Sequence, residues 1–288
     1  MSRLYKFFSP NKILRKIGLK IVRDEEFVSK EFRRYSPNKN LNEIRYQILS
    51  KKLSSEFFNN LKIKLDLKEL ISLIEEFDYI FRKFKFRNLE GGFGYNNALY
   101  LYIFIKIFKP SRIIESGVFK GFTTYIIDNA VLENTEIICI EPNINRIQYK
   151  SSKAKYYDKD ISQIELKENS NTLVFFDDHV PHINRINLIK QKNFRYIIFD
   201  DDVNISNFFH DGEPPIPTLN MIKNYEYNLK NFKWTYDNNE RSINFEIDEE
   251  SKSIFLDYYY YRFLELFEFT GYRTSSFTSI LVRNNNNN

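Results

Sequence analysis

Residues 115–123 have the sequence ESGVFKGFT. They lie where an apolar run typical of a buried strand, residues 112–118, is followed by residues 122–130, whose pattern predicts a helix. Gly117 would let the backbone turn tightly and approach a ligand, and Gly121 would allow close packing where the helix begins. The stretch is not the dinucleotide-binding pattern G-x-G-x-x-G, and no G-K-[ST] follows, as a P-loop requires. Considered alone, this stretch has a second interpretation, a tight strand-to-helix turn that binds no ligand.

Apolar runs alternate with helical segments on both sides of this turn. Helices are expected at residues 41–60, 66–84 and 97–108, and further strands at 136–140, 154–157, 172–176 and 194–199. Short apolar strands separated by helices are typical of an α/β protein with a parallel sheet covered on both faces. Near the C-terminus, residues 258–269 and 275–282 are expected to form an antiparallel pair at the edge of the sheet.

The composition describes a folded protein with a large core. The chain has 288 residues, of which 28 are Phe and 20 are Tyr. Its one cysteine, Cys139, excludes an internal disulfide and a cysteine-based zinc cluster, and we expect it to be buried in a strand. No apolar run reaches the ~18 residues of a membrane-spanning helix. No uninterrupted apolar segment follows the N-terminal charges, as it would in a signal peptide, so a cytoplasmic location is expected.

The N-terminal segment differs in charge from the rest of the chain. Seven basic residues and no acid precede Asp24, whereas the net charge of the whole chain is +5. Leu14, Ile17 and Ile21 fall on one face of a helix whose other face carries lysines. This helix either contacts a membrane surface weakly through residues 1–23 or packs on the main domain with its basic face in water. The expected organisation is a helical extension at 1–90, an α/β domain at 91–283 and a disordered tail at 284–288.

Acidic residues follow four of the predicted parallel strands. They are Glu115, Glu141, the pair Asp177 and Asp178, and the triplet Asp200 to Asp202. Ligands of open α/β sheets bind at the carboxyl ends of the strands, where these side chains would gather. Glu141 stands at the end of the second strand, where a carboxylate can accept hydrogen bonds from both hydroxyls of a ribose. A ribose-containing ligand is therefore expected.

These segments resemble motifs of the class I S-adenosylmethionine-dependent methyltransferases. The pattern E-x-G-x-F-x-G-F-T at 115–123 is similar to E-x-G-x-Y-x-G-Y-S of the metal-dependent group that includes catechol O-methyltransferase. Residues 140–142 (IEP) resemble the ribose-binding strand end, 174–179 (VFFDDH) the segment V-F-L-D-H, and 198–203 (IFDDDV) a segment ending in A-D-N-V. The resemblance covers about residues 95–205 and implies a Rossmann-like fold with a mostly parallel seven-stranded sheet.

The resemblance implies S-adenosylmethionine as cofactor. Glu115, Gly117 and Phe119 would surround its methionine part. Glu141 would hold the ribose, and Asp160 would approach the adenine amine. The full set expected to bind the cofactor is Glu115, Gly117, Phe119, Gly121, Thr123, Glu141, Asp160 and Asp177.

The resemblance also implies Mg²⁺, bound by an Asp after the fourth strand and by Asp-Asn after the fifth. The matching residues are Asp178, with Asp177 as its alternative, then Asp201 and Asp202. Oxygen ligands suit Mg²⁺, which would lower the pKa of a substrate hydroxyl and orient it toward the methyl group. The alternative is a metal-free cluster neutralised by arginines, for which Arg185 and Arg195 are the candidates.

The relatives place a lysine base shortly after their fourth-strand D-H, and this sequence has none there. His179 or His182 would replace it, since neutral imidazole is a competent base near pH 7, and Asp178 is the third catalytic candidate. Residues 210–217 would lie over the mouth of the crevice as a lid or substrate loop.

Together these features predict an S-adenosylmethionine-dependent O-methyltransferase acting on a small hydroxylated acceptor, with a sugar or glycan as one candidate. Because the lysine is missing, a second hypothesis remains, in which a methyltransferase-like protein binds the cofactor or a partner without methyl transfer. A nucleic-acid partner is not expected, because an acidic crevice repels phosphates.

Overall fold

The computed structural model describes residues 39–84, 93–166, 171–192, 194–204, 215–224, 231–236, 239–244, 247–272 and 276–284. Three expectations fall outside these residues. They concern the basic helix within 1–23, the lid segment from His210 to Pro214, and the tail at 285–288.

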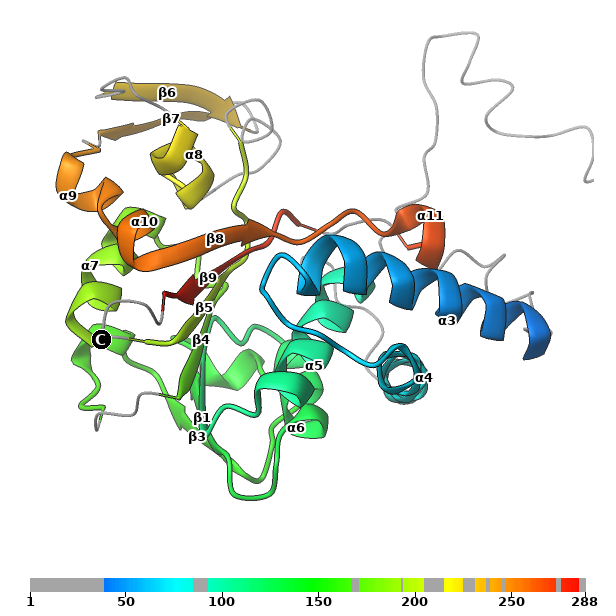
Figure 1. Ribbon diagram of the computed structural model, residues 1–288. Coiled ribbons are helices and arrows are strands. Elements are labelled where there is room, and N and C mark those ends of the chain that lie inside the picture. Colours follow the sequence, from blue (N-terminus) through cyan, green and yellow to red (C-terminus); the bar gives the residue numbers. More distant parts are fainter. Residues whose placement is uncertain are drawn as a thin grey trace, which may run out of the picture.

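A seven-stranded sheet forms the centre of the molecule, in the order β3-β2-β1-β4-β5-β9-β8 (Figure 1). Its strands are β1 (Arg112–Ser116), β2 (Glu136–Ile140), β3 (Ala154–Tyr157), β4 (Thr172–Phe176), β5 (Tyr196–Phe199), β8 (Tyr258–Arg262) and β9 (Ser279–Arg283). Strands β1 to β5 are parallel, and β9 is antiparallel to both β5 and β8. This order and these directions are those of the Rossmann-like class I methyltransferase fold, so the predicted fold class and the antiparallel edge pair are confirmed.

The chain extends the sheet from β1 in two directions. Ile114 of β1 is paired with Ile138 of β2 on one side and with Val174 of β4 on the other. Strands β2 and β3 follow on the first side, and β4 and β5 on the second. Where neighbouring strands lead away in opposite directions, a crevice opens at their carboxyl ends. The boundary between β1 and β4 is therefore where a ligand is expected.

Helices cover both faces of the sheet. They are α3 (Lys39–Leu53), α4 (Leu67–Lys83), α5 (Tyr95–Phe108), α6 (Phe122–Ala130), α7 (His182–Lys192), α8 (Leu219–Asn224), α9 (Glu249–Lys252), α10 (Ile254–Asp257) and α11 (Phe267–Thr270), with a π-helical turn at Ser54–Phe58. Because strand side chains alternate, Ile113 packs into the core shared with α3 to α6, whereas Ile114 packs into the core shared with α7, α8 and α10. Figure 1 shows α5 and α6 on one side of the sheet and α7 on the other.

The helices before the sheet belong to its core. Helix α5 is apolar on every side and is buried over most of its length, as expected for a helix enclosed on all sides. Helix α4 is capped by Asp66, whose side chain accepts a hydrogen bond from the N–H of Lys68 in the first turn. Its apolar stripe of Leu70, Ile74 and Phe77 is buried. These three side chains belong to the hydrophobic core beneath the sheet's covering helices.

A buried carboxylate ties three of these helices together. Asp78 of α4 accepts a hydrogen bond from the hydroxyl of Tyr46 on α3 at 2.7 Å, and others from Arg45 and Tyr95. Buried charges are stable only when they are paired and hydrogen-bonded in this way. The network fixes α3 and α4 against α5, which lies on the sheet.

Two elements differ from the sequence-based expectations. Strand β8 ends at Arg262, and residues Phe267–Thr270 form helix α11 instead of continuing the strand. Gly271, in the left-handed conformation at φ 73°, ends this helix, and its N–H donates to the Phe267 carbonyl. The second difference is an antiparallel hairpin, β6 (Asn231–Tyr236) and β7 (Asn239–Asn244), which was not predicted. Its polar sequence lacks the continuous apolar run that marked the other strands.

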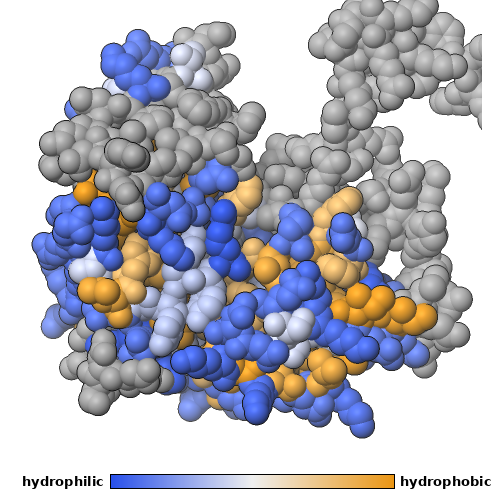
Figure 2. Space-filling view, turned by 45° about the horizontal axis from the view of Figure 1, so that its top comes forward, coloured by the Kyte–Doolittle hydropathy of each residue, from blue (hydrophilic) through white to orange (hydrophobic). Residues whose placement is uncertain are grey.

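Among the residues that the structure describes, no helix is long and apolar enough to cross a membrane. The face in Figure 2 is mostly hydrophilic, with separate apolar patches.

Candidate functional site

The turn after β1 is held against the ends of two neighbouring strands. The N–H of Gly117 donates to the Ile140 carbonyl of β2 at 2.9 Å, and φ at Gly117 is 93°. A Cβ at this position would lie 1.9 Å from the carbonyl oxygen of Asp177, which follows β4. Only glycine fits, because any side chain would push the ends of β1 and β4 apart.

Gly121 has the same role one turn later. Its φ is 92°, and a Cβ would lie 2.2 Å from the Tyr149 carbonyl oxygen. The close packing expected where α6 begins is therefore confirmed. Thr123 in the first turn of this helix is buried.

Glu141, the predicted ribose ligand, joins the ends of β1 and β2. Its side chain is 1% exposed and accepts hydrogen bonds from the N–H of Phe119 (2.8 Å), the N–H of Asn143 (2.9 Å) and the guanidinium of Arg146 (2.8 Å). Arg146 is 45% exposed and lies 5.1 Å from the Phe119 ring centre. The carboxylate is therefore buried at the ends of β1 and β2, and a ribose would have to share it with Arg146 or displace the arginine.

Glu115 is buried below the turn. One carboxylate oxygen accepts hydrogen bonds from Thr124 (2.6 Å) and from the thiol of Cys139 (3.4 Å). The other oxygen, Oε1, has no hydrogen-bond partner among the described residues. Removal from water raises the pKa of Glu115 to about 8, so the group is mainly protonated at pH 7. Cys139 is buried in β2, as expected.

Arg185 of α7 neutralises two of the acids. Its guanidinium donates to Asp160, which follows β3, at 3.1 and 2.7 Å, and to Asp178, which follows β4, at 2.7 Å. The arginine holds the pKa of Asp160 well below its usual range. Asp178 also accepts a hydrogen bond from the Ser116 hydroxyl at 2.6 Å. The expected neutralisation by an arginine is therefore present at Asp160 and Asp178, and Arg185 provides it.

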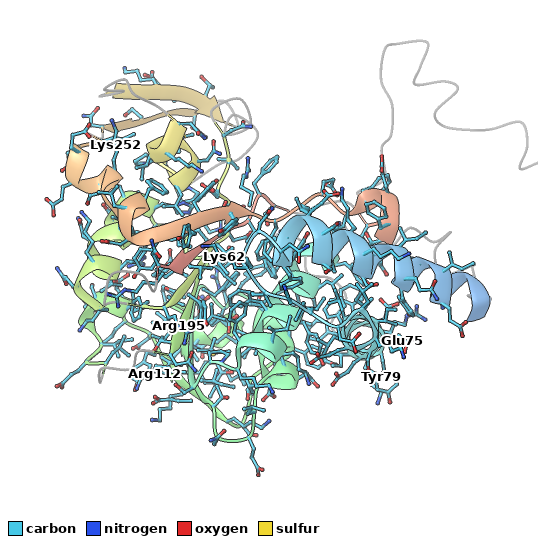
Figure 3. All side chains as sticks on the ribbon, viewed as in Figure 1. Lys62, Glu75, Tyr79, Arg112, Arg195 and Lys252 are labelled. Atoms are coloured by element: carbon cyan, nitrogen blue, oxygen red, sulfur yellow. The ribbon has the colours of Figure 1, made fainter. Side chains whose placement is uncertain are left out.

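Arg195, the other predicted neutralising residue, lies at the opposite end of the sheet. It immediately precedes β5, whereas the acids follow that strand. Arg112, the first residue of β1, stands at the same end of the parallel strands, and both arginines are labelled in Figure 3.

The three consecutive acids after β5 point in different directions. Asp200 accepts hydrogen bonds from the hydroxyls of Ser276 and Thr278, both at 2.5 Å. Asp202 is fully buried and accepts from the Asn220 N–H and the Tyr260 hydroxyl, each at 2.7 Å, and from Ser279. These two carboxylates hold the C-terminal strands and α8 to the end of β5.

The remaining acid, Asp201, lies with Asp177 and His179. One ligand atom from each of these three residues lies within 4.8 Å of the other two. The Asp177 carboxylate has no hydrogen-bond or ion-pair partner among the described residues. Desolvation raises its pKa well above the usual range, and repulsion from Asp200 and Asp201 raises it further. A desolvated carboxylate beside like charges is a natural place for a cation.

The backbone is unusual at the same positions. Among the described residues, five that are not glycine have a positive φ, and three of them are Phe119 (51°), His179 (55°) and Asp201 (52°). Each follows a central strand, β1, β4 or β5. Such conformations are uncommon for side-chain-bearing residues and cluster at functional sites.

His182, the other histidine predicted as a base, is not part of this group. His182 is 2% exposed, its Nδ1 accepts the Leu219 N–H at 3.1 Å, and its ring packs on Phe199. Burial lowers the pKa of His182 to about 3, so it stays neutral and joins α7 to α8. His210 lies outside the described residues.

Sequence reasoning missed the partners of the acids. Ser116, Arg146, Tyr260, Ser276 and Thr278 carry no motif, and most are distant in sequence from the carboxylates they contact. Only Arg146 had a usable signal, because it lies five residues after Glu141 in a short helical turn.

No protein-family model matches the sequence, and no curated protein matches it. Among solved structures, the apo structure of CmcI-N160 is similar over 40% of this chain and 55% of that chain, with 16% identity and a TM-score of 0.32. The chain thus spans about half of CmcI. SAH-bound PaMTH1 from Podospora anserina is similar over 86% of this chain and 98% of that chain, with 13% identity and a TM-score of 0.43. The O-methyltransferase TomG from Streptomyces achromogenes, in complex with SAM, matches over 84% and 98%, with 13% identity and a TM-score of 0.39.

Proposed function

We propose that this protein is an S-adenosylmethionine-dependent O-methyltransferase acting on a small hydroxylated acceptor. One observation carries the proposal. In a sheet with the strand order of the class I methyltransferases, the turn after β1 and the acids after β2, β4 and β5 meet at the carboxyl ends of the strands. Ligands of this kind of sheet bind at that place.

The turn and Glu141 fit the cofactor. Gly117 and Gly121 bring the backbone of the turn close to the end of β4 and to residue 149. Glu141 offers an almost fully buried carboxylate beside the turn, suited to a pair of ribose hydroxyls. The bound cofactor would supply an electrophilic methyl group. The chain would position an acceptor oxygen in line with it.

Asp177, His179 and Asp201 would hold a divalent cation beside the cofactor. The ion would lower the pKa of an acceptor hydroxyl that it binds. Of the oxygen ligands expected for Mg²⁺, Asp201 and the alternative Asp177 belong to this group, whereas Asp178 and Asp202 do not. Asp178 is paired with Arg185 and Asp202 is turned toward Tyr260. A sugar suits a cation site of this kind because two neighbouring hydroxyls can bind one ion, and a sugar or glycan is therefore our candidate acceptor.

The second candidate is a methyltransferase-like protein that binds the cofactor without transferring methyl groups. The hydrogen bonds of Glu141 to Arg146 and to two backbone N–H groups favour it, because the predicted ribose ligand already has three partners.

Titration calorimetry of the full chain with S-adenosylmethionine and S-adenosylhomocysteine tests the proposal. We expect both to bind, and Glu141→Ala to weaken binding at least about tenfold, since it removes hydrogen bonds to a charged group. Glu136→Ala is the matched control, because it changes a glutamate at the opposite end of the same strand, paired with Arg112. Absence of binding to the unmodified protein would overturn the proposal. Binding without methyl transfer to any hydroxylated acceptor would favour the second candidate.

A further inference from the structure

We infer that the site formed by Asp177, His179 and Asp201 binds a borderline divalent transition-metal ion, such as Fe²⁺, Co²⁺ or Zn²⁺, with the imidazole of His179 as a direct ligand. The inference deepens the proposed function and rests on it for the use of the ion. The binding itself is measured without methyl transfer.

The first step is the charge of the site. Arg185 is engaged by Asp160 and Asp178, and the Asp177 carboxylate has no hydrogen-bond or ion-pair partner among the residues described. Asp200 and Asp201 add negative charge around Asp177. Carboxylates gathered in this way repel one another unless a cation lies between them. The carboxylate of Asp177 is therefore available to bind a cation, since Arg185 is paired with Asp160 and Asp178.

The second step is the geometry of the imidazole. His179 Nδ1 lies 3.9 Å from the Oδ2 atom of Asp201, which is too long for a hydrogen bond. Two ligands about 2.1 Å from one ion lie about 3–4 Å apart, depending on the angle between them. The side chain of His179 is 51% exposed, so it has room to turn toward an ion. His182 is not available as a ligand, because its ring is enclosed and its Nδ1 accepts a backbone N–H.

The third step is the choice of metal. Oxygen ligands suit Mg²⁺ and Ca²⁺, whereas imidazole suits Fe²⁺, Co²⁺ and Zn²⁺. The neighbouring carboxylates of Asp178 and Asp202 are held by Arg185 and by Tyr260 and Asn220. The third side-chain donor beside Asp177 and Asp201 is therefore the imidazole of His179. The donor set is therefore one nitrogen and two carboxylates.

A consequence concerns the proton of the acceptor. The nitrogen lone pair that binds a metal cannot also accept a proton. His179 then acts as a ligand and not as the general base that the sequence suggested.

Mn²⁺ is a direct probe of the ligands. We would load the metal-free full chain with Mn²⁺ and record electron spin echo modulation, which reports a nitrogen bound to the ion. The expected result is nitrogen modulation in the unmodified protein and none in His179→Asp. Aspartate tolerates the left-handed backbone of position 179 and replaces the nitrogen by oxygen. In competition with Mn²⁺, the preference for Zn²⁺ over Mg²⁺ should fall by about 10- to 100-fold in His179→Asp.

A pair of variants at consecutive positions distinguishes Asp177 from Asp178 as the ligand that follows β4. Asp177→Asn should weaken Mn²⁺ binding at least about tenfold, because it removes a charged ligand. Asp178→Asn should leave binding within about threefold, because Asp178 lies on Arg185. Circular dichroism of each variant confirms its fold.

Bound Mn²⁺ without nitrogen modulation would overturn the inference, as would a protein that binds no Mn²⁺. A larger loss of Mn²⁺ affinity in Asp178→Asn than in Asp177→Asn would overturn it as well. Calorimetry with S-adenosylmethionine on the same sample keeps the proposed function separate, since the cofactor can bind when the ion does not.

Discussion

The acids at the edge of the sheet fall into two groups with opposite surroundings. On the β3 side, Asp160 and Asp178 share the guanidinium of Arg185. On the β5 side, Asp177 lies with Asp201 and His179 and has no ion-pair partner among the described residues. Asp177 and Asp178 are consecutive in the chain, yet one belongs to each group.

The difference separates structural acids from available ones. A carboxylate fixed by an arginine and hydrogen bonds holds loops in place but has little capacity left for a ligand. A carboxylate with no partner costs stability in the free protein and gains it when a cation binds. The β3 side therefore supports the crevice, and the β5 side offers the reactive positions.

The largest effect is expected when the guanidinium of Arg185, which Asp160 and Asp178 share, is removed. Arg185→Met should lower the free energy of unfolding by about 3–5 kcal/mol, mostly through Asp178, which is 12% exposed and would keep an unpaired charge. Asp160 is 38% exposed and would contribute less. Denaturant unfolding measures the change. Arg112→Met, which breaks the pair with Glu136 at the other end of β1, should cost less. Equal losses would mean that Arg185 has no special role at the acids.

The next effect concerns Glu115, a buried acid that has no ion-pair partner in the part of the chain that the structure describes. Its folded-state pKa of about 8 lies above the unfolded value, so between about pH 4.5 and 8 the folded chain holds a proton that the unfolded chain releases. Stability should therefore fall as pH rises through this window. Glu115→Gln keeps an acceptor for Thr124 but does not titrate. Between pH 5 and pH 8, its free energy of unfolding should fall by about 3 kcal/mol less than that of the unmodified protein. Thermal unfolding at both pH values measures it, and an unchanged pH dependence would show that Glu115 is ionised in the folded protein.

A smaller effect compares the two consecutive aspartates directly. In the absence of metal, Asp177→Asn should raise the free energy of unfolding by about 1 kcal/mol, because it removes repulsion from Asp200 and Asp201. Asp178→Asn should lower it by about 1–2 kcal/mol, because it weakens a charged hydrogen bond to Arg185. Denaturant unfolding of both variants in a chelator gives the signs. Two changes of the same sign would remove the distinction between the groups.

The smallest effect is expected at Arg146, which is paired with Glu141 and whose side chain is 45% exposed. Arg146→Gln should change stability by less than about 1 kcal/mol, as for other exposed ion pairs. If Arg146 competes with the ribose for Glu141, affinity for S-adenosylmethionine should rise about two- to fivefold, as calorimetry would detect. Weaker binding would instead indicate that Arg146 contacts the cofactor.

Much of the fold followed from local patterns. The strands at 136–140, 154–157 and 172–176 were predicted with the bounds that the structure has. Residues 137–140 and 173–176 are apolar runs between turn residues, which explains the accuracy there. The C-terminal segment was harder. An aromatic stretch such as Tyr258–Phe269 has strand character throughout, and the left-handed Gly271 forms a helical turn at its end.

The sequence by itself determined which strands form the sheet, which turns need glycine, and that acids would gather at the carboxyl ends of the parallel strands. Hydropathy and backbone geometry are local, so a short window contains them. Only the tertiary structure decided what each acid contacts. Asp200 and Asp202 are two residues apart, but Asp200 bonds to Ser276 and Thr278, while Asp202 bonds to Asn220 and Tyr260. Between them, the left-handed backbone of Asp201 turns its carboxylate toward Asp177. These partners come from strands and helices distant in the chain, and only packing of the finished sheet brings them together.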